Sequence, residues 1–182
     1  MATTKHTTNA EALYHYGASD FKLELLEKFP LNSLLEWSQQ EENGKLAFRS
    51  AWALEHILLG NTALFDGLQT KLMEGFCQLA NWSALRSYSK LLMYLSSDVE
   101  KVNLINEDQA MAIIEKCFGI LENSDCPVAV KVNVMDILYA FIARYDWIKN
   151  ELRLLIELEL EKEATPALRS RGAKILKRIL KS

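Results

Sequence analysis

Three side chains that could contact a partner molecule fall on one face of a predicted helix. Arg49, Trp52 and His56 are spaced at i, i+3 and i+7, so they share one stripe of that helix. They supply a cation, an aromatic ring and an imidazole that titrates near neutral pH. This pattern predicts a surface for an acidic or aromatic group of a protein or peptide partner. The alternative interpretation is structural, because most large aromatic side chains at helical spacing pack between helices.

Two further groups have both a functional and a structural interpretation. Asp136 lies on the polar face of a predicted central helix and could accept a proton only if a reacting group lay beside it. Its ordinary role is an ion pair, either exposed to solvent or between neighbouring helices. Tyr14, His15 and Tyr16 could contact a ligand, but we favour docking of this tail onto the end of the domain.

Residues that would indicate metal, cofactor or nucleophile chemistry are scattered. The Cys and His residues are far apart and show no zinc-ligand spacing. Phosphate-binding glycine loops, nucleophile elbows and H-E-x-x-H motifs are not found. We therefore expect no catalytic residue, no metal, no cofactor and no enzymatic activity. The three cysteines are isolated from one another: Cys77, Cys117 and Cys126. Isolated cysteines are typical of a reducing compartment, so we expect a cytoplasmic protein.

The composition is that of one folded domain. The 182 residues are 49% hydrophobic and 25% charged, with a net charge of −3, which excludes a disordered chain. No apolar run reaches the length of about 18 residues that a membrane span requires, and the N-terminal stretch lacks the apolar core of a signal peptide. We expect a partly ordered tail at residues 1–17 and a single domain at residues 18–182.

Helical periodicity continues from Ser19 almost to the last residue. Valines alternate with other residues over 128–134, as in a strand, but a lone strand would leave its backbone groups without hydrogen bonds. The sequence therefore predicts an all-α protein of eight to ten helices. The predicted helices cover residues 21–29, 31–37, 46–59, 62–79, 84–95, 106–121, 128–144, 147–160 and 166–180.

Four of these helices share a local pattern, in which an apolar residue directly precedes a cation. The cations are separated by 37, 45 and 38 residues, and a unit of that length is typical of helical repeat proteins. We predict that the four cations occupy equivalent positions and are structural, bonding to turn carbonyls or to acids. The pairs are Phe48-Arg49, Leu85-Arg86, Val130-Lys131 and Leu168-Arg169.

The last two units resemble the HEAT and armadillo-like helical repeat family. NSDCPVAVKVNVMDIL contains Asp125, Pro127 and Lys131, and EATPALRSRGAKILKRIL contains Pro166 and Arg169. The resemblance covers roughly residues 20–182. It implies an α–α superhelix, a HEAT-like solenoid of about four helical hairpins. It also implies a non-enzymatic scaffold that binds a protein or peptide.

A narrower resemblance, to HEAT-like DNA alkylation-repair glycosylases, implies an enzyme acting on nucleic acid. Those proteins need a basic groove with aromatic and carboxylate side chains, for which Trp52, Trp147 and Asp136 or Asp146 are candidates. Residues 166–182 carry six cations and no acid, so the whole-chain charge of −3 leaves −9 for the rest. An acidic body disfavours a phosphate-binding groove, and we do not expect a nucleic-acid partner.

The last predicted helix, 166–180, has one apolar and one basic face. Such a helix could lie on an anionic membrane or on nucleic acid. We expect instead that it closes the helical repeat, with its cations directed toward solvent and toward the preceding acidic helix. The acids of that preceding segment are Glu151, Glu157, Glu159, Glu161 and Glu163.

Overall fold

The computed structural model describes residues 10–162 and 164–181, and every element of regular secondary structure in these ranges is a helix. Nine α-helices in these ranges agree with the predicted eight to ten. The chain forms two compact units, Met1–Leu91 and Leu92–Ser182. The first nine residues of the predicted tail and Glu163 of the predicted acidic helix lie outside the described residues.

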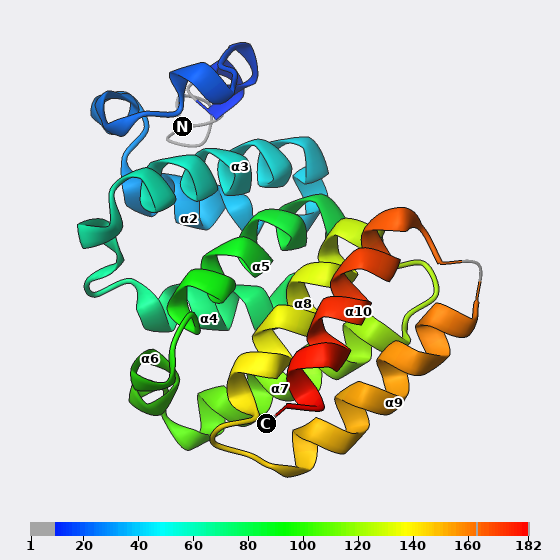
Figure 1. Ribbon diagram of the computed structural model, residues 1–182. Helices are drawn as coiled ribbons and strands as arrows, with labels where there is room; N and C mark the ends of the chain where they lie inside the picture. The colour runs from blue at the N-terminus through cyan, green and yellow to red at the C-terminus, as the bar shows by residue number, and fades with distance from the viewer. Residues whose placement is uncertain (1–9, 163, 182) are drawn as a thin grey trace. The chain divides into compact units, whose positions relative to one another are not determined.

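The first unit starts with short 3₁₀ turns and continues with α-helices (Figure 1). The turns are η1 (Ala12–His15), η2 (Ala18–Asp20), η3 (Leu23–Glu27), η4 (Glu41–Asn43) and η5 (Thr62–Phe65). The helices are α2 (Leu31–Ser38), α3 (Gly44–Gly60) and α4 (Gln69–Gln78), followed by α5 (Trp82–Leu95), in which the first unit ends.

Residues 10–17 of the predicted tail pack against α3. Leu13 of η1 is fully buried, and η1 contacts α3. Apolar burial therefore holds this segment on the domain. The predicted division into a tail at 1–17 and a domain at 18–182 stays a prediction.

The predicted α-helix over 21–29 is wrong, because a 3₁₀ turn, η3 (Leu23–Glu27), forms in this region and follows another, η2 (Ala18–Asp20). The Asp20 carboxylate accepts a hydrogen bond from the Gly17 backbone N–H at 2.7 Å, so it closes a tight turn instead of capping a helix. Phe21, Leu25 and Phe29 are nevertheless buried. The spacing of these three residues predicts correctly which side chains are buried. The local hydrogen bonds of the turn determine that the backbone is a 3₁₀ helix and not an α-helix.

The predicted helix over 62–79 is broken into η5 and α4. Gly67 lies in the break with a φ of 77°, a left-handed conformation that side chains disfavour. Gly75, in contrast, lies within α4, where a Cβ atom would approach a ring carbon of Tyr88 to 2.8 Å. The hydroxyl of Tyr88 shares a buried hydrogen bond of 2.7 Å with that of Ser38. Gly75 thus permits the close approach of α4 to the first part of α5.

The second unit contains two consecutive helical pairs, and α8 lies beside α10 (Figure 1). The helices are α6 (Val99–Leu104), α7 (Glu107–Glu122), α8 (Val128–Phe141), α9 (Trp147–Glu161) and α10 (Pro166–Ile179). The side chains of Asp98, Asn106 and Thr165 cap α6, α7 and α10 by accepting a hydrogen bond from the backbone three residues later. α6 is an addition to the predicted helices, and its six residues are too few for a clear period.

The strand-like valines at 128–134 belong to α8. This helix contacts α7, α9 and α10, so it is buried on most of its circumference. Its buried residues include Val130, Val134, Ile137 and Phe141. A helix that is apolar on several faces loses the period of a surface helix, which explains the alternation without a strand.

Trp147, at the start of α9, stacks on Phe118 of α7 with 5.9 Å between ring centroids. Its side chain stays 47% exposed. No helix in residues 10–162 and 164–181 is long and apolar enough to cross a membrane.

Candidate functional site

The three predicted binding residues of α3 do lie together. The Arg49 guanidinium lies 5.2 Å from the Trp52 ring centroid, and the Trp52 and His56 rings are 5.7 Å apart in an edge-to-face arrangement. Phe21, which sequence reasoning did not include, packs against Trp52 at 5.1 Å. Helical spacing identified the stripe on α3, but only tertiary packing adds Phe21 to it.

The chain itself occupies much of this cluster. Arg49 donates hydrogen bonds to the backbone carbonyls of Tyr14, at 3.2 Å, and of Tyr16. The Lys45 ammonium lies 4.3 Å from the Tyr14 ring centroid. These contacts are the tail docking expected for Tyr14 to Tyr16. A partner-binding role for Arg49, Trp52 and His56 stays a prediction.

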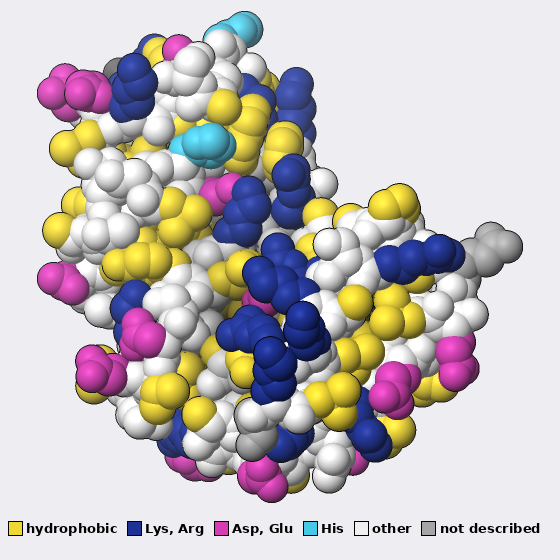
Figure 2. All heavy atoms as spheres, viewed as in Figure 1, with side chains coloured by type: hydrophobic (Ala, Val, Ile, Leu, Met, Phe, Trp, Pro, Cys, Tyr) yellow, Lys and Arg dark blue, Asp and Glu magenta, His cyan; other side chains and the backbone are white. Residues whose placement is uncertain are grey.

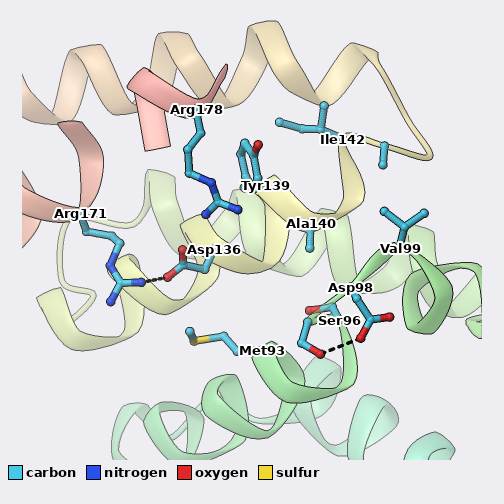
Figure 3. A pocket seen from close by; sticks show the side chains of 12 residues that line it. Met93, Ser96, Asp98, Val99, Asp136, Tyr139, Ala140, Ile142, Arg171 and Arg178 are labelled. Carbon is cyan, nitrogen blue, oxygen red and sulfur yellow. Dashed lines mark hydrogen bonds and ion pairs between the residues drawn. The ribbon is translucent and has the colours of Figure 1, made fainter. Parts of the chain in front are cut away.

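A second candidate site is a hollow of about 470 Å³ in the second unit, which no sequence motif indicated. The end of α5, the start of α6 and the helices α8 and α10 surround it (Figure 3). Its walls are formed by Met93, Ser96, Ser97, Asp98, Val99, Asp136, Tyr139, Ala140, Ile142, Ala143, Arg171 and Arg178. Three segments that are distant in sequence, 93–99, 136–143 and 171–178, contribute these side chains, so neither periodicity nor spacing could have predicted the hollow.

The charged groups of the hollow come mainly from α8 and α10. Arg171 forms an ion pair with Asp136, and the Arg178 guanidinium lies 3.9 Å from the Tyr139 ring centroid. Figure 3 shows the two guanidinium groups directed toward Asp136. The expectation of an inter-helix ion pair for Asp136 is therefore confirmed.

Burial and charge act on the pKa of Asp136 in opposite directions. Burial raises the pKa above its ordinary value of 3.8, while the charges of Arg171, Arg178 and Lys174 lower it, and the net shift is upward. The three cations of α10 are thus close enough to act on one carboxylate.

On the α6 side of the hollow, the polar groups are engaged with their own segment. The Ser97 hydroxyl and the Lys101 backbone N–H donate to Asp98 at 3.1 and 2.9 Å, and the Lys101 ammonium lies 3.8 Å from the same carboxylate. The Ser96 hydroxyl donates to the Leu92 carbonyl at 2.8 Å. No nucleophile and base are paired among these groups.

In the described residues, the arginines of α10 that have ionic or cation–π contacts bind α8 and not the acidic helix that was expected. Arg171 and Arg178 contact Asp136 and Tyr139 of α8. Glu159 of α9 binds Lys131 of α8 at 2.7 Å instead. The apolar face of α10 sets its rotation, because its buried residues must face both α8 and α9.

The four cations of the repeat pattern have different surroundings. Arg49 bonds to turn carbonyls and Lys131 to an acid, as predicted, whereas Arg86 and Arg169 are exposed. Near Lys131, burial raises the pKa of the Cys126 thiol to about 11. A thiol with that pKa is a weak nucleophile at neutral pH.

Within residues 10–162 and 164–181, no group of three or more His, Cys, Asp or Glu side chains could hold a metal ion. A family model described as a HEAT repeat domain matches residues 23–179. Comparison with curated proteins gave no match, and neither did comparison with solved structures. The family match and the helical structure confirm the predicted fold class, an all-α protein of the α–α superhelix type.

Proposed function

The chain belongs to the HEAT repeat family, and from this premise we propose that it is a non-enzymatic module that binds a protein or peptide segment. Stacked helical pairs form extended surfaces suited to such binding. Family membership alone supports a helical scaffold and leaves the kind of partner open.

The observation that carries the proposal is the hollow in the second unit. Its volume of about 470 Å³ lies within the range of roughly 300–1,000 Å³ that is usual for ligand sites. Its wall combines apolar side chains, such as Val99, Ala140 and Ile142, with the cations Arg171 and Arg178. A short peptide can supply both kinds of group, since it can carry an apolar side chain beside a charged one.

The polar contacts around the hollow support binding over catalysis. Asp136 is held by Arg171, and Ser96 and Ser97 donate to groups of their own segment. General acid–base catalysis would need one of these groups to be directed at a substrate proton, whereas each of them is bonded to another group of the protein. We therefore propose no catalytic residue.

We also propose a cytoplasmic location. All three cysteines remain as thiols, which is usual where glutathione keeps proteins reduced. Fractionation of cells that express the tagged protein tests this proposal, and recovery of the protein in a membrane or secreted fraction would overturn it.

Selection from a displayed library of random dodecapeptides tests the binding function. We expect enrichment on the wild-type protein and loss of enrichment on Ala140→Trp, which fills the hollow from α8. Ala129→Trp is the matched control, because Ala129 is an exposed residue of the same helix. Enrichment that is equal on both variants would place binding elsewhere, and no enrichment on the wild type would contradict peptide binding.

A second measurement separates binding from the glycosylase alternative. The protein is incubated with alkylated double-stranded DNA, and released bases are quantified by chromatography. We expect release no faster than in the absence of protein. Release that is abolished by Asp136→Asn or Asp146→Asn would show that the chain is an enzyme and overturn the proposal.

A further inference from the structure

We propose that the segment bound in the hollow is acidic, with a carboxylate of the partner on Lys174 and Arg178 of α10 and an adjacent aliphatic side chain against the wall. This inference rests on the proposed function and specifies the chemistry of the partner. Four observations support it: the charge of the site, the orientation of α10, the contacts of Arg178 and the apolar residues of the wall.

The first step is the charge at the α8–α10 side of the hollow. Arg171 and Arg178 line the hollow together with Asp136. Lys174 lies outside the wall, three residues after Arg171 on α10, and its charge also acts on the Asp136 carboxylate, so three positive charges lie near a single acid. The other acid of the wall, Asp98, lies 3.8 Å from the Lys101 ammonium. The site therefore has an excess of two positive charges, which an anionic partner group would balance.

The second step is the orientation of α10. Arg171, Lys174 and Arg178 are spaced at i, i+3 and i+7, so they form one stripe, and the two arginines of this stripe meet α8. Lys and Arg side chains gather over α8 and α10 in Figure 2. Glu159, the buried acid of α9, is bound by Lys131 and Lys162, so it does not reduce this charge.

The third step is the way in which Arg178 is held. Its guanidinium carbon lies 3.9 Å from the Tyr139 ring centroid, and this cation–π contact is not an ion pair with a carboxylate, so Arg178 can still bind one. Arg171 already uses N–H groups on Asp136. Arg178 and Lys174 are therefore the cations that would receive the partner.

The fourth step is the apolar part of the wall. Val99, Ala140, Ile142 and Ala143 line the same hollow as Arg178, and Val99 is 51% exposed. Burial of an aliphatic side chain there contributes binding energy that a free carboxylate lacks. The site thus favours an Asp or Glu beside a Leu, Ile or Val over a small anion.

A protein segment fits this charge better than a nucleic acid. Backbone recognition of DNA relies on several phosphate contacts, whereas the excess here is two charges and residues 1–165 carry a net −9. The same acidic body repels a long polyanion and tolerates a short acidic peptide.

The test is the composition of dodecapeptides selected from the random library on variants of the full-length chain. We expect the wild type to enrich peptides with two or more acids beside aliphatic residues. Lys174→Glu/Arg178→Glu should weaken the binding of a selected peptide at least tenfold by calorimetric titration. Lys177→Glu, at an exposed position of α10 outside the stripe of Arg171, Lys174 and Arg178, should change it less than threefold.

Thermal melting checks that each variant is folded. The milder double variant Lys174→Gln/Arg178→Gln should weaken the binding of the selected peptide about threefold. Enrichment of neutral or basic peptides would overturn the proposal of an acidic partner while leaving peptide binding intact. The same holds if the double variants bind acidic peptides as tightly as the wild type does. Displacement of the peptide by double-stranded DNA with higher affinity would overturn it in favour of phosphate binding. A selection without any enriched peptide would overturn this inference together with the proposed function.

Discussion

Lys131 and Glu159 form an ion pair in which both residues are buried, at 5% and 8% exposure. Removal of one partner leaves the other charge buried without compensation, which typically costs about 3–5 kcal/mol. We expect Lys131→Met to lower the free energy of unfolding by about 3 kcal/mol in urea titrations, because Lys162 still offers Glu159 a partial partner. The double variant Lys131→Met/Glu159→Met should recover most of the loss, and a double variant no more stable than the single one would contradict this account.

The same pair makes stability depend on pH. Burial by itself raises the pKa of Glu159, but hydrogen bonds from Lys131 and Lys162 outweigh it and hold the pKa below the ordinary 4.5. A carboxyl whose pKa is lowered on folding stabilises the protein above its unfolded pKa, and this contribution is lost as the pH falls through the folded pKa. We expect denaturation curves to show a smaller loss of stability on acidification below pH 4.5 in Glu159→Gln than in the wild type.

Arg49 and Arg86 hold matching places in the sequence repeat but should respond differently to substitution. Arg49 binds the Tyr14 carbonyl and stacks near Trp52, so Arg49→Ala should cost about 1–3 kcal/mol. Arg86 is exposed, so Arg86→Ala should stay within about 0.5 kcal/mol of the wild type. Thermal melting measures both variants. If Arg49→Ala cost as little stability as is expected of Arg86→Ala, the contacts of Arg49 with the tail would not stabilise the domain.

At the scale of the helix, two glycines should respond to alanine with opposite signs. A Cβ at Gly75 would lie 2.8 Å from a ring carbon of the buried Tyr88, so Gly75→Ala should destabilise by about 1–3 kcal/mol. A Cβ at Gly119 in α7 would meet nothing within 4 Å, so Gly119→Ala should stabilise by roughly 0.5–1 kcal/mol. Urea titration measures both, and stabilisation by Gly75→Ala would mean that α4 and α5 can move apart at little cost.

The elements also show how far sequence reasoning reaches. Long periodic segments such as α3 and α7 were predictable, because one buried face and clear end signals agree. The 3₁₀ turns before Pro30 were not predictable from the sequence. The spacing of the buried residues Phe21, Leu25 and Phe29 is compatible with an α-helix as well as with the observed 3₁₀ turns. The stripe of Arg49, Trp52 and His56 followed from helical geometry. The hollow did not, because the rotation of α10 against α8 depends on tertiary packing.

For the whole chain, α10 should act as the closing element of its unit. Its residues Leu168, Gly172, Ile175 and Ile179 are buried, and it packs on both α8 and α9. Deletion of residues 166–182 would expose the apolar surfaces of those helices, so we expect aggregation in light scattering and a lower melting temperature.

Two point substitutions in α10 separate loss of packing from loss of charge. Ile175→Asp should reproduce the aggregation, because Ile175 is fully buried. Lys177→Asp should leave solubility and melting close to the wild type, because Lys177 is exposed. A truncated chain that keeps its melting temperature and solubility would show that α10 is a ligand-binding appendage and not a structural cap.

The stack of Trp147 on Phe118 gives the second unit its own optical signal. Of the four tryptophans, Trp37, Trp52 and Trp82 precede residue 92, and Trp147 alone follows it. Its half-exposed indole should emit at longer wavelength than the buried Trp37 and be quenched more readily by acrylamide. The emission lost in Trp147→Phe therefore belongs to residues 92–182, and its dependence on denaturant can be followed separately from that of the other three indoles.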